Sequence, residues 1–481
     1  MRRTKIVATL GPATDTAKAI ESLVLAGVDV ARVNFSHGSA EDQIRRVELV
    51  RDIAARHDRY VGVLADLQGP KIRIERFESG AVTLAEGDAF VLDPEADPGR
   101  GSRAGVGITY KDLPRDVHGG DTLLLDDGHI VLTVDTVKRG KIQTHVQVGG
   151  QLSNNKGINR LGGGLSADAL TDKDRRDIEV AARMRADYLA VSFPRSAADV
   201  EQARTLLRKA GGHGAIMAKI ERTEAVHAID EIVMAADAVM IARGDLGVEI
   251  GDAELPAVQK RIIQIARSLD RVVVTATEMM QSMVTSPVPT RAEVFDVANA
   301  VLDGTDAVML SAESATGMYP AKAVEAMDRI CAGAEKHRQA MQSNYRINTR
   351  FQRADEAIAM ASMYTANHLG VAAIAALTES GSTPLWMSRI SSGIPIYALT
   401  PHEHTLRKVT LYRGVYPLPF RVSSFDHAHV NLDAIKLLKS RGAVKDGDLV
   451  IITKGDLMGR HGGTNAMKIV KVGDMVQPQD S

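Results

Sequence analysis

Cysteine, aromatic side chains and long apolar runs are all scarce in this chain of 481 residues. Its one cysteine, Cys331, excludes intrachain disulfides and cysteine-based zinc or iron–sulfur sites, and it suits a reducing cytoplasm. Aromatic residues make up 4% of the chain, too few for a stacking platform that binds single-stranded nucleic acid. No segment approaches the roughly 18 continuous apolar residues of a membrane span, so we expect no membrane partner.

An excess of charge of either sign is also missing. Lys plus Arg total 59 and Asp plus Glu total 60, which leaves a net charge of −1. Nucleic-acid-binding proteins usually carry a strong basic bias, so this balance predicts no nucleic-acid partner. The two arginines near the start, Arg2 and Arg3, precede no secretory apolar core. Together these absences predict a cytoplasmic protein.

The chain does contain short, apolar, β-branched runs that alternate with amphipathic stretches such as Ala40–His57 and Ala253–Leu269. The runs are too short for helices and lack polar alternation, which is typical of strands buried on both faces of a parallel sheet. Eight runs alternating with helices predict an α/β fold, a (β/α)₈ TIM barrel. They are Lys5–Leu10, Val28–Asn34, Val61–Leu67, Asp187–Phe193, Ala215–Glu221, Ala238–Arg243, Arg271–Thr277 and Ala307–Ser311.

Two further segments differ from this pattern. Residues 74–160 contain strand-like pieces and a hairpin that turns at Asp127-Gly128, which predicts a small inserted β-barrel domain placed to act as a lid. From residue 346 a new series begins with the helical Asp355–Leu369 and predicts a separate open α/β domain. Its expected strands are Ala372–Leu377, Ile394–Leu399, Gly414–Leu418 and Leu449–Thr453. The predicted domains are thus a barrel over 1–73 and 161–345, an insert over 74–160 and a last domain over 346–481.

Charged side chains gather where these runs end, and in a barrel the carboxyl ends of the strands carry the chemistry. Lys219 and Glu221 are two apart on one strand, so their side chains point the same way, and Asp245 follows the next strand. Two carboxylates without a nearby His or Cys suit a hard cation such as Mg²⁺. A lysine with arginines at neighbouring strand ends suits a phosphorylated substrate. Gly244 lets a ligand approach the backbone closely.

Four motifs stand in order on successive strands and connect these residues to a known family. They are Ala31–Gly38, Met217–Glu221, Arg243–Gly247 and the block from Pro289 to Glu313. Together they resemble the pyruvate kinase family over essentially the whole chain. The resemblance implies transfer of the phosphoryl group of phosphoenolpyruvate to ADP, giving pyruvate and ATP, and it implies a homotetramer.

The resemblance also assigns roles at the positions that match the family's motifs. Glu221 and Asp245 would hold Mg²⁺ or Mn²⁺, and Lys219 would neutralise charge on the transferring phosphoryl group and the enolate. Arg32 would contact the phosphate, and Thr277 would belong to the group that protonates the enol. The substrate carboxylate would be received by Gly244, Asp245 and Thr277. The nucleotide-binding residues would be Asn34, His37, Arg73 and Lys156, although a structural role for His37 is an equal alternative.

A region for a monovalent cation departs from the pattern of K⁺-requiring members. The ligand positions in those members correspond to Asn34, Ser36, Asp66 and the backbone of Leu67. The positions that depart together here are Leu67, Gln68, Lys71 and Ile74. Because an ammonium group is compact and singly charged, we predict that Lys71, which replaces an acidic residue, substitutes for the cation and that K⁺ is not required. A solvated lysine is the alternative.

A second departure concerns Asn159-Arg160-Leu161-Gly162-Gly163-Gly164, which stands where many relatives have a Leu-Pro-Gly turn. Because of this departure, the sequence does not show which residues form the hinge of the insert.

The last domain has a candidate anion site in a hydroxyl-rich loop between a strand and Pro384. The resemblance implies that this loop binds a phosphorylated sugar or nucleotide as an allosteric effector. Its phosphate-binding residues would be Thr378, Ser380, Gly381, Ser382 and Thr383, and Gly459–Asn465 could close over it. A plain helix cap is the alternative.

Two other function classes stay open on this sequence. A Mg²⁺-dependent lyase or aldolase could share the barrel, although the insert and the last domain argue against it. A non-catalytic relative would be expected to have lost Lys219, Glu221 or Asp245, and all three are present. Cys331 lies in the apolar helical pattern Met327–Ala334 and fits a core position better than a nucleophile.

Overall fold

The computed structural model of the chain describes residues 1–337, 350–422, 426–456 and 462–474. A closed barrel contains eight strands in the order β1-β16-β15-β14-β13-β12-β3-β2. Each predicted run contains one of them, and their side chains are nearly all buried, as expected for strands covered on both faces. The strands are β1 (Lys5–Thr9), β2 (Val30–Asn34), β3 (Gly62–Asp66), β12 (Tyr188–Val191), β13 (Ala215–Ile220), β14 (Ala238–Ala242), β15 (Val272–Ala276) and β16 (Ala307–Leu310). The predicted TIM barrel is confirmed.

The chain divides into two compact units, which are described separately. Unit 1 comprises 1–65, 184–188 and 266–481. Its first helices begin at side-chain caps: Thr16 accepts a hydrogen bond from Ala19 N, and Ser39 with Asp42 forms a capping box. The helices of its amino-terminal and middle parts are α1 (Ala17–Ala26), α2 (Ala40–Arg56), α10 (Arg291–Asp303), α11 (Ala312–Ala315) and α12 (Pro320–Ala334). Cys331 is buried in α12, and this burial raises its pKa to about 12, as suits a core residue.

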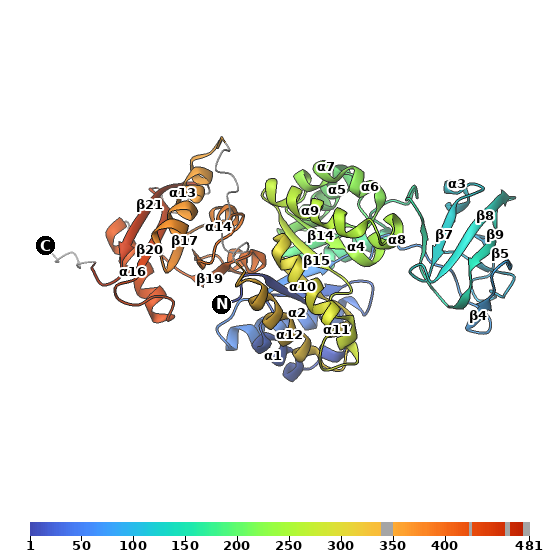
Figure 1. Cartoon of the computed structure of the whole chain (residues 1–481), viewed down its shortest axis with the longest axis horizontal. Helices are drawn as coiled ribbons and strands as arrows, with labels where there is room; N and C mark the ends of the chain where they lie inside the picture. Colours follow the sequence, from blue (N-terminus) through green and yellow to red (C-terminus); the bar gives the residue numbers. More distant parts are fainter. Residues whose placement is uncertain (338–349, 423–425, 457–461, 475–481) are drawn as a thin grey trace. The chain divides into compact units, whose positions relative to one another are not determined.

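The last part of unit 1 is a five-stranded sheet in the order β19-β18-β17-β20-β21, drawn in orange and red in Figure 1. The strands are β17 (Ala373–Leu377), β18 (Ile396–Thr400), β19 (Val415–Pro419), β20 (Leu449–Gly455) and β21 (Thr464–Lys471). The helices are α13 (Ala354–Leu369), α14 (Ser382–Ser388), α15 (Glu403–Lys408) and α16 (His427–Ser440). The first four strands were predicted, whereas β21, antiparallel to β20, was not.

Two sequence expectations in this part touch residues outside the described ranges. The predicted boundary at 345/346 lies between 337 and 350, and the first three residues of the expected loop Gly459–Asn465 precede residue 462. The end of that expected loop is strand, because Thr464 and Asn465 begin β21.

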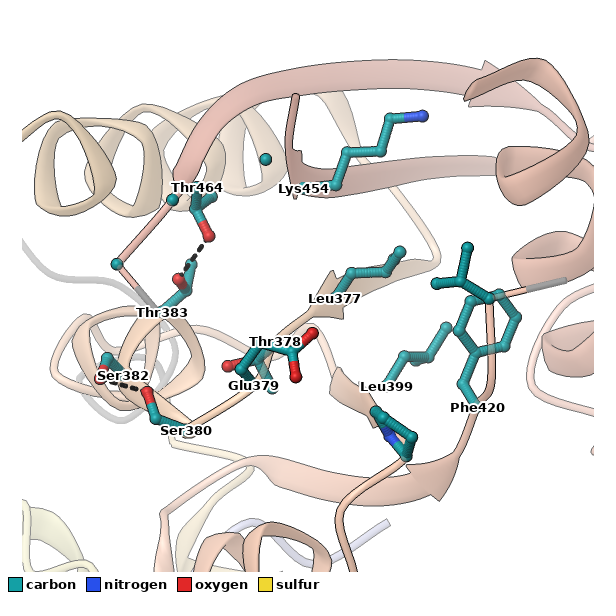
Figure 2. Close-up of a pocket in the computed structure, with 15 residues that line it drawn as sticks. Leu377, Thr378, Glu379, Ser380, Ser382, Thr383, Leu399, Phe420, Lys454 and Thr464 are labelled. Atoms are coloured by element: carbon teal, nitrogen blue, oxygen red, sulfur yellow. Dashed lines mark hydrogen bonds between the residues drawn. The ribbon is translucent and has the colours of Figure 1, made fainter. Parts of the chain in front are cut away.

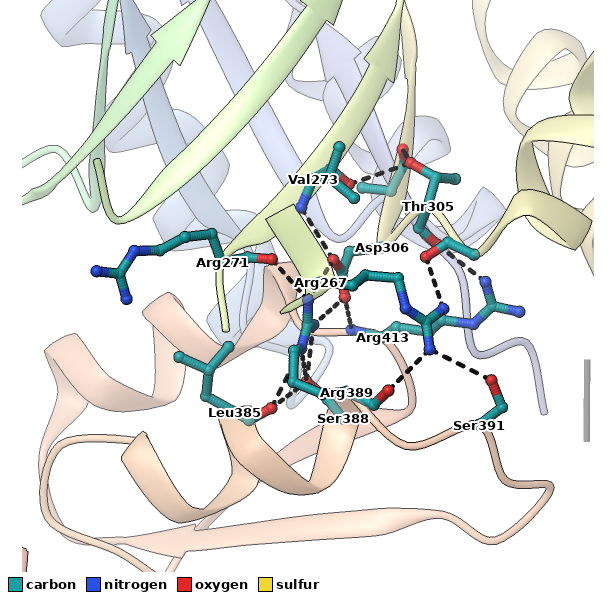
Figure 3. A network of polar contacts seen from close by, with 12 residues as sticks. Arg267, Arg271, Val273, Thr305, Asp306, Leu385, Ser388, Arg389, Ser391 and Arg413 are labelled. Atoms are coloured by element: carbon teal, nitrogen blue, oxygen red, sulfur yellow. Dashed lines mark hydrogen bonds and ion pairs between the residues drawn. The ribbon is translucent and has the colours of Figure 1, made fainter. Parts of the chain in front are cut away.

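A buried ion pair joins this last part to the barrel strands within unit 1 (Figure 3). Arg389, directly after α14, pairs with Asp306, which precedes β16, and their side chains are 1% and 2% exposed. Arg389 Nη1 donates to Asp306 Oδ2 at 2.9 Å and to Arg271 O at 2.7 Å. Asp306 Oδ2 also accepts a hydrogen bond from Val273 N at 2.9 Å. One carboxylate therefore holds α14 against the beginnings of β15 and β16.

Unit 2 comprises 66–183 and 189–265. Its all-β segment forms a six-stranded sheet, β11-β7-β8-β9-β5-β6, and a two-stranded sheet, β10-β4, drawn in blue and cyan in Figure 1. The predicted hairpin is present: Leu123 lies opposite Leu132, and Asp127 and Gly128 have φ of 56° and 88°. The strands are β4 (Ala81–Leu84), β5 (Ala89–Asp93), β6 (Gly105–Gly107), β7 (Thr122–Leu125), β8 (Ile130–Lys138), β9 (Lys141–Val148), β10 (Gly150–Ser153) and β11 (Ile158–Arg160).

The helices of unit 2 follow its barrel strands. They include α4 (Asp172–Arg183), α5 (Ala197–Lys209), α6 (Thr223–His227), α7 (Ile229–Ala235) and α8 (Arg243–Ile250). α8 begins directly after β14 and starts with Arg243, Gly244 and Asp245. Of the described helices, none combines the length and the apolar character that crossing a membrane would need.

We expect the substitution Asp306→Ala to destabilise the protein strongly. It leaves the Arg389 guanidinium buried without its counter-charge and the Val273 amide without its acceptor, and such a loss typically costs about 3–5 kcal/mol. Urea unfolding followed by circular dichroism should show a clearly lower midpoint. The control is Asp446→Ala, which breaks the exposed pair with Lys439 and should cost less than about 1 kcal/mol. Equal midpoints for the two variants would contradict the structural role of Asp306.

Candidate active site

A buried ammonium group stands near the carboxyl end of β13 in unit 2. Lys219 Nζ lies 2.9 Å from Glu221 Oε1 and 3.3 Å from Asp66 Oδ1, and it donates to Ser192 Oγ at 2.7 Å. Lys219 is 8% exposed, and Asp66 and Glu221 are almost fully buried. The structure thus brings the predicted Lys219 and Glu221 together. It also places Asp66, expected in a monovalent-cation region, against the same ammonium.

A second ion pair lies in the same unit at the start of α8. Lys71 Nζ donates to Asp245 Oδ1 at 3.0 Å, with both side chains partly exposed. Asp245 is the third residue of α8 and Gly244 the second. Lys71 therefore forms an ion pair with a predicted metal ligand.

The carboxylates of this unit influence one another electrostatically. Burial is the main cause that raises the pKa of Glu221, and the like charge of Asp245 adds to the increase, while Lys219 opposes it. A divalent cation bound by both carboxylates would relieve this repulsion, so the donor set fits Mg²⁺. Within the described residues, no group of three or more His, Cys, Asp or Glu side chains could hold a metal. Two protein carboxylates would leave the remaining positions to substrate and water oxygens.

The predicted nucleotide-side residues of unit 2 lie on two adjacent segments. Arg73 forms an antiparallel bridge with Gly157, and its Nη1 donates to Asn155 O at 2.9 Å. Lys156 Nζ pairs with Asp126 Oδ1 at 2.7 Å. The structure therefore brings Arg73 and Lys156 onto neighbouring chain segments, each with a local partner in place.

The predicted residues of unit 1 lie at the ends of β2 and β15. Arg32 is 8% exposed and donates from Nη1 to Thr9 Oγ1 at 3.0 Å. Asn34 Oδ1 accepts a hydrogen bond from Ser36 N at 3.0 Å, which closes a local turn. His37 follows this turn and is exposed. Asn34 and Ser36 are thus used at least in part to shape their own loop.

Thr277 has an unusual backbone conformation directly after β15. Its φ is 67° and that of Glu278 is 55°, and a β-branched residue with positive φ is a true outlier. The Thr277 hydroxyl donates to Ala276 O at 2.6 Å. Buried Glu313 holds the adjoining chain by accepting hydrogen bonds from Met280 N and Ser311 N. Strain of this kind persists where the surroundings fix it and is common at functional sites.

Ser192 is a residue that sequence reasoning missed. Its hydroxyl contacts both Lys219 Nζ and Leu67 O, each at 2.7 Å. It follows β12, the fourth predicted strand, and the available signal was that a polar residue closes this run just as charged residues close its neighbours. The adjoining Phe193 N donates to Glu221 Oε2 at 2.9 Å and so also helps to orient the carboxylate.

Two family models match the chain. One, described as pyruvate kinase, barrel domain, covers residues 1–324, and the other, described as pyruvate kinase, alpha/beta domain, covers residues 356–470. The chain belongs to the pyruvate kinase family. Membership decides between the function classes left open by sequence, in favour of a phosphotransferase.

Curated pyruvate kinases match over nearly the full length. Pyruvate kinase II of Salmonella typhimurium is 56% identical over 476 residues, which are 98% of this chain and 99% of that relative. Pyruvate kinase of Haemophilus influenzae is 54% identical over 459 residues, 95% of this chain and 96% of that relative. Pyruvate kinase of Methylorubrum extorquens is 42% identical over 474 residues, 98% of each chain.

Apart from the residues described so far, the chain has a pocket in the last part of unit 1 (Figure 2). Thr378 Oγ1 accepts from Gly381 N at 2.9 Å, the hydroxyls of Ser380 and Ser382 lie 2.8 Å apart, and Thr383 bonds to Thr464 of β21 at 2.9 Å. The residue before α14 is Gly381, with φ of 84° and no side-chain cap, so a plain hydroxyl cap does not describe this loop.

The charged side chains that line this pocket already have hydrogen-bond partners. Lys454 Nζ donates to His427 O at 2.9 Å and to Asn431 Oδ1 at 2.8 Å. Glu379 also lines the pocket, and its carboxylate is hydrogen-bonded to the His402 imidazole. Among the described lining residues, Lys454 is the one lysine or arginine, so hydroxyl and amide groups are the main anion-binding donors here.

A smaller cavity lies beside Asp245 in unit 2. It is lined by residues that include Lys71, Asn159, Phe193, Arg222, Asp245 and Glu249. Glu249 is 3% exposed, and its carboxylate accepts a hydrogen bond from Thr223 N at 3.0 Å. Burial raises the pKa of Glu249 from 4.5 to about 7.

We expect this carboxyl group to make stability depend on pH. Because its pKa is higher in the folded protein than in the unfolded chain, the folded state binds the proton more tightly. Its contribution is therefore full below pH 4.5 and is lost as the pH rises towards about 7. The melting temperature of the wild type minus that of Glu249→Gln should fall between pH 5 and pH 8, whereas a constant difference would refute the raised pKa.

Proposed function

We propose that Lys219, Glu221 and Asp245 form the phosphoryl-transfer centre of this chain. As a member of the pyruvate kinase family, the chain transfers the phosphoryl group of phosphoenolpyruvate to ADP, giving pyruvate and ATP, with Mg²⁺ as the family's metal ion. The observation that carries the assignment is the buried Lys219 ammonium, fixed by Asp66, Glu221 and Ser192. A positive charge that is already held in place in a site with little water stabilises negative charge that develops in the transition state, because the surrounding groups need not reorganise.

The chemistry of the reaction assigns a task to each group. Phosphoryl transfer needs positioning and charge stabilisation more than covalent help from the protein. Lys219 neutralises charge on the transferring group and on the enolate left behind. Mg²⁺, or Mn²⁺ in its place, would be held by Glu221 and Asp245 and would neutralise phosphate and carboxylate oxygens.

We assign the remaining predicted residues to substrate and nucleotide. Arg32 contacts the phosphate, and the backbone of Gly244 and Asp245 with the Thr277 hydroxyl receives the substrate carboxylate. The strained φ of Thr277 supports a functional role because such a conformation needs a reason to be kept. The nucleotide side consists of Asn34, His37, Arg73 and Lys156, and the insert over 74–160 acts as the lid.

We expect Lys219→Met to lower kcat by about a thousandfold or more, since it removes the charge that stabilises the transition state. Two buried carboxylates would then be able to share a proton and let the protein fold. Turnover should be measured by coupled oxidation of NADH, with circular dichroism as the check on folding. The control Lys173→Met removes a partly exposed lysine of the same unit and should leave kcat unchanged. Near-normal turnover of Lys219→Met would refute the assigned role.

The contact between Lys71 and Asp245 supports the proposal that this ammonium replaces K⁺. Its distance of 3.0 Å from Asp245 Oδ1 puts a fixed monovalent charge beside a proposed Mg²⁺ ligand. A resident ammonium would also repel a second monovalent cation. We therefore propose that Asn34, Ser36, Asp66 and the Leu67 backbone bind no essential K⁺ in this chain.

We predict that the steady-state rate is the same in KCl and in a salt of a large organic cation. The variant Lys71→Glu, which restores an acidic group, should have a low rate that K⁺ raises severalfold. Ionic strength is held constant in all assays. A many-fold activation of the wild type by K⁺ would overturn the proposal, whatever the variant does.

We propose that the pocket around Thr378–Thr383 binds the phosphate of an effector. Ser380, Ser382 and Thr383 line the pocket, and their hydroxyl groups could donate hydrogen bonds to phosphate oxygens. Glu379 beside them disfavours ligands with much negative charge. A phosphorylated sugar or nucleotide that bears one phosphate group fits this balance best.

We predict that such an effector lowers the phosphoenolpyruvate concentration needed for half-maximal rate. The saturation curve should be measured with ribose 5-phosphate, glucose 6-phosphate or AMP added, and Ser382→Asp should abolish the shift by placing a like charge in the pocket. The absence of a shift with every ligand would remove the proposal.

We also propose an assembly and a cellular location for this chain. The exposed apolar side chains Val288, Phe295 and Met318 of unit 1 support a subunit contact, and we propose a homotetramer with dihedral symmetry. We also propose that the chain is cytoplasmic and that its domains are 1–73 with 161–345, 74–160 and 346–481.

A further inference from the structure

A cavity in unit 1 is lined by positively charged and hydroxyl side chains, with no carboxylate among the described residues that surround it. The polar side chains of this lining belong to Arg3, Arg267, Ser388, Ser391, Ser392 and Arg413. The proposed effector pocket differs because it contains Glu379, and the cavity beside Asp245 also contains the carboxylate of Glu249. The lining of the cavity in unit 1 therefore favours an anion over a cation or a zwitterion.

Arg413 brings to this cavity a buried charge that no acidic side chain balances directly. The residue is 9% exposed, and its Nη1 donates to Val301 O at 2.9 Å and to Thr305 O at 3.0 Å (Figure 3). Within the parts of the chain that the structure describes, no carboxylate forms an ion pair with this guanidinium. Its Nε and Nη2 likewise have no hydrogen-bond partner there, so their protons are available to a ligand.

The two carboxylates that influence Arg413 already have other partners. Asp306 pairs with Arg389, and Glu335 accepts a hydrogen bond from Arg3 N at 2.8 Å and lies 3.5 Å from Arg3 Nε. Burial lowers the pKa of Arg413, Glu335 opposes this decrease, and the like charge of Arg3 adds to it. Because arginine does not lose its proton in proteins, the charge has to be compensated from within the cavity.

The size of the cavity limits what can provide this compensation. Its volume of about 20 Å³ has room for one group of about the size of a water molecule. Chloride is only slightly larger than water, whereas phosphate and sulfate, with four oxygens each, need more space. The Ser391 hydroxyl accepts a hydrogen bond from Arg267 Nη2 at 3.4 Å, which leaves its own proton for an anion.

We propose that this cavity binds one monatomic anion, chloride, beside Arg413 and Ser391. The ion supplies a negative charge at the place where the carboxylates of the protein are already engaged. Arg3 directly precedes Thr4 and β1, Ser391 follows α14, and Arg413 precedes β19. The bound anion therefore stabilises the contact between the first barrel strand and the last part of unit 1. The proposal does not depend on any role assigned to the active-site residues.

We expect chloride to raise the melting temperature of the wild type in a saturable manner. An ion that binds only the folded state stabilises it increasingly as its concentration exceeds its dissociation constant, which should shift the melting temperature by about 1–3 °C. The measurement uses circular dichroism in mixtures of sodium chloride and sodium gluconate at constant ionic strength, because gluconate is too large for the cavity.

Two substitutions of Ser391 form a matched pair for this test. Ser391→Asp places a permanent carboxylate at the cavity, so the melting temperature should no longer depend on chloride. Ser391→Asn has nearly the same size as the aspartate variant but no charge, so its response to chloride should remain. Ser391 is only partly buried, so both variants are expected to fold.

Bromide, which can replace chloride, locates the ion directly. Crystals grown in sodium bromide should give an anomalous peak in the cavity of the wild type and none in that of Ser391→Asp. Equal melting temperatures of the wild type in chloride and gluconate would overturn the proposal. An undiminished chloride response of Ser391→Asp would also overturn it, because the ion would then bind elsewhere. A wild-type cavity without bromide would assign this space to water and refute the anion site.

Discussion

The burial of one ammonium group is the constraint on which the active-site end of unit 2 depends. A lysine that is 8% exposed is stable only if its charge is matched and its protons are accepted. Asp66, Glu221 and Ser192 meet that need, and each lies at the end of a different barrel strand or beside Lys219 itself. These contacts therefore stabilise the ends of β3, β12 and β13 around one buried positive charge.

Unit 1 also contains a buried ion pair, between Arg389 and Asp306. Arg389 and Asp306 are more deeply buried than Lys219, and the carboxylate additionally accepts a backbone hydrogen bond. The difference lies in what surrounds each pair. Asp306 has its oxygens occupied by Arg389, Val273 and Arg413, whereas Glu221, beside Lys219, is also influenced by the charge of Asp245, which lines a cavity.

The barrel was predictable because its strands are buried on both faces and so appear as continuous apolar runs. β21 escaped prediction because its exposed residues Asn465 and Lys468 break the run, and its place at the edge of the sheet permits that. At the site, Lys219, Glu221 and Asp245 were visible from their spacing along strands. Ser192, which accepts a hydrogen bond from Lys219, was not, since this contact joins segments that are distant in sequence.

The single tryptophan of the chain gives one of these segments an optical label. Trp386 is half-buried in α14, and the guanidinium carbon of Arg353 lies 5.2 Å from its ring centroid. The same short helix begins with Ser382 and Thr383 of the proposed effector pocket and ends next to Arg389. With no second indole to obscure it, the emission excited selectively from tryptophan has one source, and its wavelength reports the polarity around α14 without any label having to be introduced.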